Sequence, residues 1–172
     1  LGWSYVEGAE LSPDESDERS SLKDVVLEKR LTESLKRINP WINDENLRKV
    51  VRDLTKTIYS NLVEANQAIW TQINQSVSVM QDLGKGNKSQ TVHIIDFENL
   101  ENNEYLCTNQ FKVSGVNQNI IPDILCFVNG LPLAVIECKS PFITNPIEAG
   151  IKQLLRYANR RTPEDDEGAE KL

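Results

Sequence analysis

The chain of 172 residues contains no long hydrophobic run, one methionine and few aromatic residues. No apolar stretch approaches the roughly 20 residues that a membrane-spanning helix needs. The start of the chain also lacks the basic, apolar and small-residue regions of a signal peptide. We therefore expect a soluble globular domain that is cytoplasmic and has no membrane partner. Its length suits one domain with a sizeable core.

Cysteine and histidine are scarce, which limits several kinds of chemistry. The three cysteines, Cys107, Cys126 and Cys138, occupy apolar segments without CxxC spacing. An odd number in this pattern argues against a disulfide framework or a zinc site, so we expect three buried, reduced thiols. The only histidine, His93, has no serine or cysteine partner close to it in the sequence. A packed or partly exposed histidine is therefore expected there, with no catalytic role.

The first half of the chain has mainly helical periodicity. Ser20 or Ser21 can cap a helix that runs to about Ile38, where Asn39-Pro40 ends it. Asn43 can cap a second helix, and a third helical piece is expected after a break near residues 59–61. Three tryptophans are expected to anchor helices to the core, namely Trp3, Trp41 and Trp70. The apolar stripe of the second helix is formed by Leu47, Val50, Val51, Leu54 and Ile58.

From Thr91 the pattern becomes strand-like. Strands are expected over 92–97, 105–113, 121–128 and 132–138, and Asn129-Gly130 is a strong hairpin signal between the last two. A helix follows from Ile147 to about Arg160, with an apolar face for the sheet formed by Ile151, Leu154, Leu155 and Ala158. This order of elements favours an α/β or α+β fold. The turn-like segment 84–89 does not match GxxxxGK[ST], so no nucleotide-triphosphate site is expected.

Charged residues mark both ends of the last predicted hairpin. Pro122-Asp123 opens its first apolar run, and Glu137 and Lys139 close its second. Because side chains alternate along a strand, Glu137 and Lys139 should point to the same side. The short turn should bring Asp123 to the same end of the sheet. Two carboxylates that hold Mg²⁺ beside a lysine are suited to hydrolysis of a phosphodiester.

The helix after this hairpin offers supporting residues. Gln153 and Tyr157 are spaced i,i+4 and therefore share a face, and Arg156 lies between them in sequence. Beside a carboxylate pair they could orient DNA or support the metal ligands. By itself, the segment would be an ordinary helix surface.

The formal net charge of −7 is unusual for a protein that binds nucleic acid, since phosphates are normally neutralised by lysine and arginine. Much of the acid, however, lies in 13–18 and 164–167. The segment 139–161 is basic, with five basic residues against Glu148 alone. We therefore expect a domain that supplies chemistry and depends on a partner for most of its DNA affinity.

Pro122-Asp123 with Glu137-Cys138-Lys139 resembles the PD-(D/E)xK nuclease motif. The longer string from Ile121 to Lys139, followed by Gln153-Leu154-Leu155-Arg156-Tyr157, resembles the amino-terminal nuclease domain of type I restriction enzyme R subunits. The segments 1–6 and 35–40 are similar to the same family, so the resemblance covers nearly the whole chain.

This resemblance implies a restriction-endonuclease-like α/β core with a mixed central sheet, flanked by helices and preceded by an amino-terminal helical region. Asp123 and Glu137 would bind Mg²⁺, Lys139 would be the catalytic lysine, and Gln153 and Tyr157 would be the QxxxY pair. The family cleaves double-stranded DNA together with methyltransferase and specificity subunits. ATP is used by motor domains, which this chain lacks.

We accordingly expect one endonuclease domain over 1–172, a fragment of a longer motor-containing subunit. Its mainly helical part is expected over 1–90, and the sheet and helix that carry the site over 91–161. Family members also have an earlier helix with an acidic site residue; Glu33 or Glu64 could replace it, and the sequence does not choose between them. Two alternatives stay open, a stand-alone repair or junction-resolving nuclease and a non-catalytic docking domain.

Overall fold

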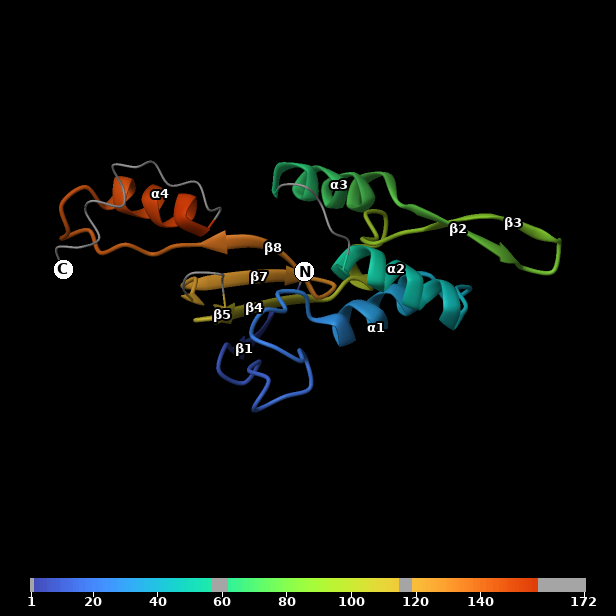
Figure 1. The fold of residues 1–172 in the computed structure, drawn as a ribbon, viewed down its shortest axis with the longest axis horizontal. Coiled ribbons are helices and arrows are strands. Elements are labelled where there is room, and N and C mark those ends of the chain that lie inside the picture. Colours follow the sequence, from blue (N-terminus) through green and yellow to red (C-terminus); the bar gives the residue numbers. More distant parts are fainter. Residues whose placement is uncertain (1, 57–61, 115–118, 158–172) are drawn as a thin grey trace. The chain divides into compact units, whose positions relative to one another are not determined.

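The computed structural model describes residues 2–56, 62–114 and 119–157. The chain divides into two units, Leu1–Val135 and Ile136–Leu172. Figure 1 labels the helices, which are α1 (Glu28–Ile38), α2 (Asp44–Lys56), α3 (Leu62–Gln75) and α4 (Pro146–Tyr157), with a 3₁₀ turn at Leu100–Asn102. The strands are β1 (Ser4–Glu7), β2 (Val77–Asp82), β3 (Asn87–Val92), β4 (Tyr105–Asn109), β5 (Val113–Ser114), β6 (Asn119–Ile120), β7 (Ile124–Val128) and β8 (Leu131–Ile136).

A mixed four-stranded sheet confirms the predicted α/β class. Its strand order is β1-β4-β7-β8. Strand β1 pairs with β4 in parallel, whereas β4 pairs with β7 in antiparallel fashion. Two separate antiparallel pairs, β2-β3 and β5-β6, lie outside this sheet. Local hairpins and one long-range parallel pairing together make the fold.

Apolar side chains of the first unit form two buried clusters. One cluster joins α1 and α2 to the β2-β3 hairpin, and includes Leu35, Val50 and Val79. The other contains Phe111 and Phe127, whose ring centroids lie 5.4 Å apart in an edge-on arrangement. Edge-on aromatic pairs are favourable because the positive edge of one ring meets the negative face of the other. The helices and the sheet therefore each contribute to a core.

The first helix begins later than expected. Helix α1 starts at Glu28, so the prediction that Ser20 or Ser21 caps it was wrong. The amide of Leu27 donates to the carbonyl of Gly130 at 2.9 Å, and the carbonyl of Leu22 accepts from the amide of Ser114 at 2.8 Å. These tertiary hydrogen bonds hold the preceding segment in a non-helical path. Local periodicity could not reveal them.

The second helix agrees with the sequence. The side-chain Oδ1 of Asn43 accepts a hydrogen bond from the amide of Asn46 at 2.8 Å, as an N-cap does. The predicted stripe is buried in the described part of the helix, at Leu47, Val50, Val51 and Leu54. Ile58 and the break expected near 59–61 lie outside the described residues. The third helix is also confirmed as α3.

Only one of the tryptophans contributes to a core. Trp41 is partly buried against the helical cluster. Trp3 is 48% exposed and Trp70 is 67% exposed, so the prediction that they anchor helices in the core was wrong. Trp3 instead lies 5.2 Å from Tyr105, ring centroid to ring centroid, beside the edge strand β1.

The region expected as one strand over 92–97 is divided differently. Strand β3 ends at Val92, and its partner β2 was not predicted. The side chain of Asn39 explains the end point, because its Oδ1 accepts from the amide of His93 and its Nδ2 donates to the carbonyl of His93. Both backbone groups of His93 are therefore bonded to the Asn39 side chain and do not extend the β2-β3 ladder. The turn between β2 and β3 contains Gly84 and Gly86, each with positive φ.

The other strands need smaller corrections. Strand β4 ends at Asn109 because Gln110 adopts a φ of 47°, and β5 is a separate short strand. The hairpin turn is confirmed, with φ values of 54° at Asn129 and 78° at Gly130, as a type I′ turn requires. A Cβ at Gly130 would lie 2.5 Å from the carbonyl oxygen of Leu27, so glycine is needed there. Strands β7 and β8 are shorter than predicted, which leaves Asp123 and Glu137 just outside them.

Helix α4 begins at Pro146, and none of its residues is buried. The apolar side chains of Leu154 and Leu155 are 41% and 40% exposed. Their predicted packing on the sheet would cross the unit boundary and stays a prediction. Ala158 and the expected end of the helix near residue 160 lie outside the described residues. Among the helices described, none has the length and apolar composition that a bilayer crossing requires.

Candidate functional site

Glu137 and Lys139 follow β8 directly in the second unit. The side chain of Glu137 is 2% exposed and that of Lys139 is 23% exposed. Their charged atoms, Glu137 Oε2 and Lys139 Nζ, lie 3.5 Å apart. The two side chains therefore reach the same side of the chain, as the alternation predicted. Cys138 between them is exposed, so the prediction of a buried thiol there was wrong, because the alternation turns it away from this ion pair.

Gln153 of helix α4 connects the two charged residues. Its Nε2 donates to Glu137 Oε2 at 2.6 Å, and its Oε1 accepts a short hydrogen bond from Lys139 Nζ. A Cβ added at Gly150, one turn earlier, would lie 3.7 Å from Cγ of Lys139, so the stem of the lysine runs close to the helix. The amide can hold both charged partners because it presents a donor and an acceptor on one rigid plane.

Tyr157 extends the same network along α4. Gln153 Nε2 donates its second hydrogen to Tyr157 Oη at 2.6 Å. Burial raises the pKa of Tyr157, and the neighbouring Glu137 carboxylate raises it further, because it accepts a hydrogen bond from the neutral phenol and because a second anion there is unfavourable. The predicted i,i+4 pair therefore does share a face. The Arg156 guanidinium carbon lies 5.6 Å from the centroid of the Tyr157 ring, within reach of a cation–π interaction.

The two carboxylate oxygens of Glu137 differ in their partners. Oε2 is bonded by Gln153, whereas Oε1 is buried and has no hydrogen-bond partner among the described residues. A buried carboxylate oxygen without a donor is costly unless a cation satisfies it. Mg²⁺ prefers such oxygens and usually keeps several waters, so one or two carboxylates suffice. The donor chemistry at Glu137 therefore fits this ion, although no group of three His, Cys, Asp or Glu side chains within the described ranges could enclose a metal.

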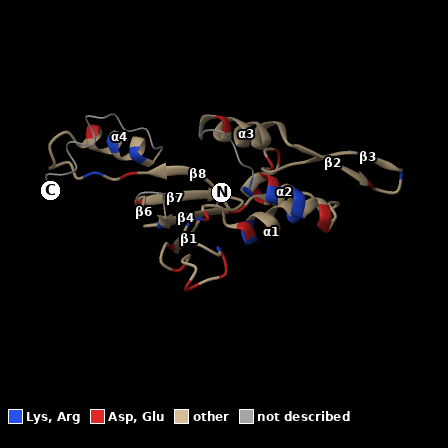
Figure 2. Cartoon of the chain, in the orientation of Figure 1, with Lys and Arg blue, Asp and Glu red and all other residues tan. Residues whose placement is uncertain are grey.

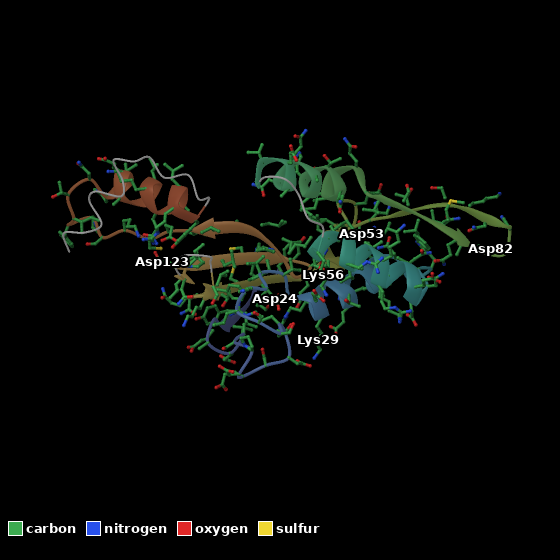
Figure 3. All side chains as sticks on the ribbon, viewed as in Figure 1. Asp24, Lys29, Asp53, Lys56, Asp82 and Asp123 are labelled. Carbon is green, nitrogen blue, oxygen red and sulfur yellow. The ribbon has the colours of Figure 1, made fainter. Side chains whose placement is uncertain are left out.

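Asp123 belongs to the other unit, immediately before β7, and is labelled in Figure 3. Gln110 contacts it twice. The Gln110 amide donates to the Asp123 carbonyl at 3.2 Å, and the Gln110 side-chain Nε2 lies 3.4 Å from Asp123 Oδ1. Because Glu137 and Lys139 belong to the second unit, the convergence of Asp123 with them on one ion stays a prediction. The same holds for Glu33 and Glu64, which are exposed on α1 and α3 of the first unit.

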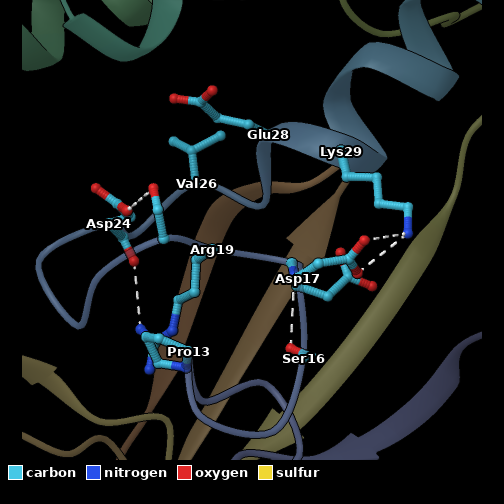
Figure 4. A pocket seen from close by; sticks show the side chains of 10 residues that line it. Pro13, Ser16, Asp17, Arg19, Asp24, Val26, Glu28 and Lys29 are labelled. Carbon is cyan, nitrogen blue, oxygen red and sulfur yellow. Dashed lines mark hydrogen bonds and ion pairs between the residues drawn. The ribbon is translucent and has the colours of Figure 1, made fainter.

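A buried arginine organises the acidic loop before α1, and the sequence did not indicate it. The Arg19 guanidinium donates to the carbonyl oxygens of Leu11, Asp24 and Lys112, and its central carbon lies 4.0 Å from the Phe111 ring centroid. Figure 2 colours the acidic residues of this loop red. Together with neighbouring residues they line a cavity of about 460 Å³, shown in Figure 4 with the ion pair between Lys29 and Asp17.

His93 has a serine neighbour that sequence distance concealed. The Nδ1 of His93 lies 3.1 Å from the hydroxyl of Ser76, 17 positions earlier. The Asp96 carboxylate is nearby in sequence, but one oxygen accepts from the amides of Glu98 and Asn99, while the other accepts from the Asn102 side chain. These bonds hold the pKa of Asp96 below its usual value. They also show that its carboxylate stabilises the local turn. The contact therefore does not form a catalytic triad.

Nearly the full length of the chain is similar to known proteins. A family model described as "Type I restriction enzyme R protein N terminus" matches residues 1–170. The type I restriction enzyme HindI endonuclease subunit of Haemophilus influenzae is 35% identical over 143 residues, which are 82% of this chain and 14% of that protein. A Methanocaldococcus jannaschii protein, provisionally named type I restriction enzyme MjaIXP endonuclease subunit, is 35% identical over 144 residues, again 82% of this chain and 14% of the relative.

A second Methanocaldococcus jannaschii protein, provisionally named the MjaVIIIP endonuclease subunit, is 31% identical over 159 residues, or 91% of this chain and 14% of the relative. The chain thus spans a small part of these relatives, and the family match identifies that part as the amino-terminal region. The predicted family is confirmed. This chain belongs to the family of type I restriction enzyme R protein N termini.

Proposed function

We propose that this chain is the magnesium-dependent nuclease region of a type I restriction enzyme R subunit and cleaves double-stranded DNA. The observation that carries the proposal is the network around Gln153, which holds Glu137 and Lys139 side by side. Within the described part of the chain, it leaves Glu137 Oε1 buried and without a hydrogen-bond donor. The family membership and the relatives' names, which describe endonuclease subunits, support a nuclease.

Each residue has a defined part in this proposal. Glu137 Oε1 and the carboxylate of Asp123 would hold Mg²⁺. When bound, the ion polarises the scissile phosphate and lowers the pKa of a coordinated water. The Lys139 ammonium, fixed beside Glu137, offsets negative charge that builds on the phosphate oxygens. Gln153 positions both side chains, and Tyr157 holds the second hydrogen of the Gln153 amide.

The complete enzyme would couple this site to ATP-driven translocation and would act with methyltransferase and specificity subunits. The relatives' much greater length leaves room for such domains, since the aligned part is 14% of each relative. A strongly acidic chain, with a net charge of −7, also suits a nuclease region that receives DNA from its partners.

Cleavage by the full-length subunit in its restriction complex tests the proposal. We expect Asp123→Ala, Glu137→Gln and Lys139→Ala to reduce cleavage of plasmid duplex DNA by at least about 100-fold, with ATP hydrolysis retained. Lys152→Ala is the matched control, because Lys152 is a surface residue of α4 that pairs with Glu148. Cleavage that persists in the Lys139→Ala complex would favour the non-catalytic docking domain instead.

Magnesium binding provides a second readout that does not require cleavage. Isothermal titration of this chain with MgCl₂ should give binding that Glu137→Gln removes and Lys152→Ala preserves. The Gln side chain keeps the shape and one oxygen of Glu137 but loses the charge that attracts a hard cation. Equal binding by the Glu137→Gln and parent chains would exclude Glu137 as a ligand.

A further inference from the structure

Two thiols face each other across the central pair of strands in the first unit. Cys107 of β4 and Cys126 of β7 are direct partners in the antiparallel register. Their sulfur atoms lie 3.4 Å apart, although the residues are 19 positions apart in sequence. Cys126 is buried, at 9% exposure, whereas Cys107 is partly exposed, so the prediction of a buried thiol at Cys107 was wrong. The fold therefore brings together one accessible thiol and one protected thiol.

We infer that Cys107 and Cys126 form a reversible cross-strand disulfide when a small-molecule disulfide or similar mild oxidant is present. A disulfide requires sulfurs about 2.05 Å apart, so the pair must close by little more than 1 Å. Rotation about the Cα–Cβ bonds and a small approach of the strands can provide this movement. Residues directly opposite each other are among the few strand pairs close enough to be bridged.

The reaction proceeds by two exchanges. The thiolate of Cys107 attacks one sulfur of the oxidant RSSR, forming a mixed disulfide and releasing RS⁻, which takes up the proton lost by Cys107. Cys126 then loses its proton, attacks Cys107 Sγ and displaces the second RSH. In total, two protein thiols and RSSR become one protein disulfide and two RSH. The protein loses two protons and two electrons, and the oxidant gains both.

The partial exposure of Cys107 and the burial of Cys126 determine this order of attack. Burial raises the pKa of Cys126 to about 11, and the hydrogen bond with Cys107 contributes in the same direction. Cys126 is therefore a poor first nucleophile towards a reagent in solvent. Its sulfur is nevertheless in position for the second, intramolecular exchange, because the neighbouring strand holds it beside Cys107.

The disulfide would act on the strand end that carries Asp123. The β4-β7 ladder runs from the cysteine pair to the pair Asn109 and Ile124, and the next hydrogen bond joins the Gln110 amide to the Asp123 carbonyl. A covalent bond within the ladder limits separation of the strands and so reduces opening at that end. This effect does not depend on nuclease activity, so it can be measured whether or not the chain cleaves DNA.

The test uses the chain with Cys138→Ser, which leaves only the pair as thiols. Incubation with glutathione disulfide should lower the count of free thiols from two to none. The protein mass should fall by about 2 Da without an added glutathione, and a tryptic peptide should link Cys107 to Cys126. Dithiothreitol should restore both thiols. Cys107→Ser in the same background is the control and should form no intramolecular bond.

Two physical readouts complete the test. The oxidised chain should unfold at a temperature higher by roughly 5 °C, because the bond closes a loop in the unfolded state. Hydrogen exchange at the Gln110 amide should also slow. The inference is overturned if both thiols stay reactive after oxidation in the Cys138→Ser chain, or if only glutathione adducts or intermolecular dimers form.

Discussion

A side-chain amide is central to each unit, and the two amides have different partners. In the first unit, Asn129 is completely buried; its Nδ2 donates to the carbonyl of Ile94 and to Asn103 Oδ1, and its Oδ1 accepts from the amide of Glu104. In the second unit, Gln153 is partly exposed and bonds the ionisable groups of Glu137 and Lys139. The Asn129 amide satisfies backbone groups of neighbouring segments, whereas the Gln153 amide bridges two ionisable side chains.

The surroundings of the two networks differ in the same way. Asn129 lies in a turn beside apolar clusters that contain Leu31 and Phe127. The helix that carries Gln153 has no buried residue. Satisfying buried backbone groups contributes to folding stability, while a network that includes the buried Glu137 carboxylate contributes less, because desolvation of the charge offsets much of the attraction. We therefore expect mutations in the first unit to affect stability and mutations in the second to affect chemistry.

The largest effect is expected for Gly130→Ala. Its Cβ would lie 2.5 Å from the Leu27 carbonyl oxygen and 2.8 Å from the Leu31 amide nitrogen, in a residue whose φ is 78°. We expect a loss of about 4 kcal/mol in the free energy of unfolding, measured by urea denaturation. Gly84→Ala is the control, because φ there is 90° but no atom lies within 4 Å of an added Cβ, and it should cost about 1 kcal/mol. Equal losses would mean that the close contact is unimportant.

The next effect compares the two amides directly. Asn129→Ala leaves buried backbone and side-chain groups without partners, so unfolding should become easier by about 3 kcal/mol. Gln153→Ala should cost less free energy of unfolding than Asn129→Ala, because Lys139 Nζ, 3.5 Å from Glu137 Oε2, still compensates its charge. It should, however, reduce Mg²⁺ binding and DNA cleavage. Denaturation together with magnesium titration on both variants checks the contrast. A large stability loss in Gln153→Ala would show that the second network is structural as well.

The two units also differ in the expected reactivity of their thiols. Cys126 in the first unit is buried with its pKa raised to about 11, and Cys138 in the second is exposed. At pH 8, iodoacetamide should modify Cys126 on the order of 100-fold more slowly than an exposed thiol, because little thiolate is present and access is limited. Mass spectrometry of tryptic peptides over time measures both rates. Comparable rates would indicate that β7 opens readily.

The smallest effect concerns Tyr157. Its pKa is raised by burial and by Glu137, so the folded state favours the neutral phenol. The resulting contribution to stability is present below the ordinary tyrosine pKa of 10.0 and is lost as pH rises through the higher pKa of the folded protein. An absorbance titration at high pH should show one late-ionising tyrosine that Tyr157→Phe removes. If all tyrosines ionise together in both chains, the environment inferred for Tyr157 is wrong.

The sequence predicted features that depend on short-range rules. Asn43 caps α2 because its side chain reaches an amide three residues later, and Asn129-Gly130 forms a turn because both residues accept positive φ. The pairing of Glu137 with Lys139 and of Gln153 with Tyr157 also follows from alternation and helical spacing. Each of these relationships involves residues no more than four positions apart.

Other features depend on contacts between distant segments, and periodicity misplaced them. The start of α1 depends on the hydrogen bond between Leu27 and Gly130, and the end of β3 depends on the side chain of Asn39. The burial of Arg19 and the closeness of Cys107 to Cys126 likewise require segments that meet only after folding. These contacts leave no local pattern, because their partners are chosen by packing.

The sequence by itself determined the family and the α/β class, since motif spacing and local conformational preferences depend on neighbouring residues. It also supplied the residue types that the proposed nuclease would use. Only the tertiary structure decided that Gln153 joins Glu137 to Lys139 and that, among the residues described, none donates to the second buried carboxylate oxygen. Hydrogen-bond partners and desolvation depend on which atoms meet in space. For that reason a list of candidate residues becomes a chemical site only after the chain has folded.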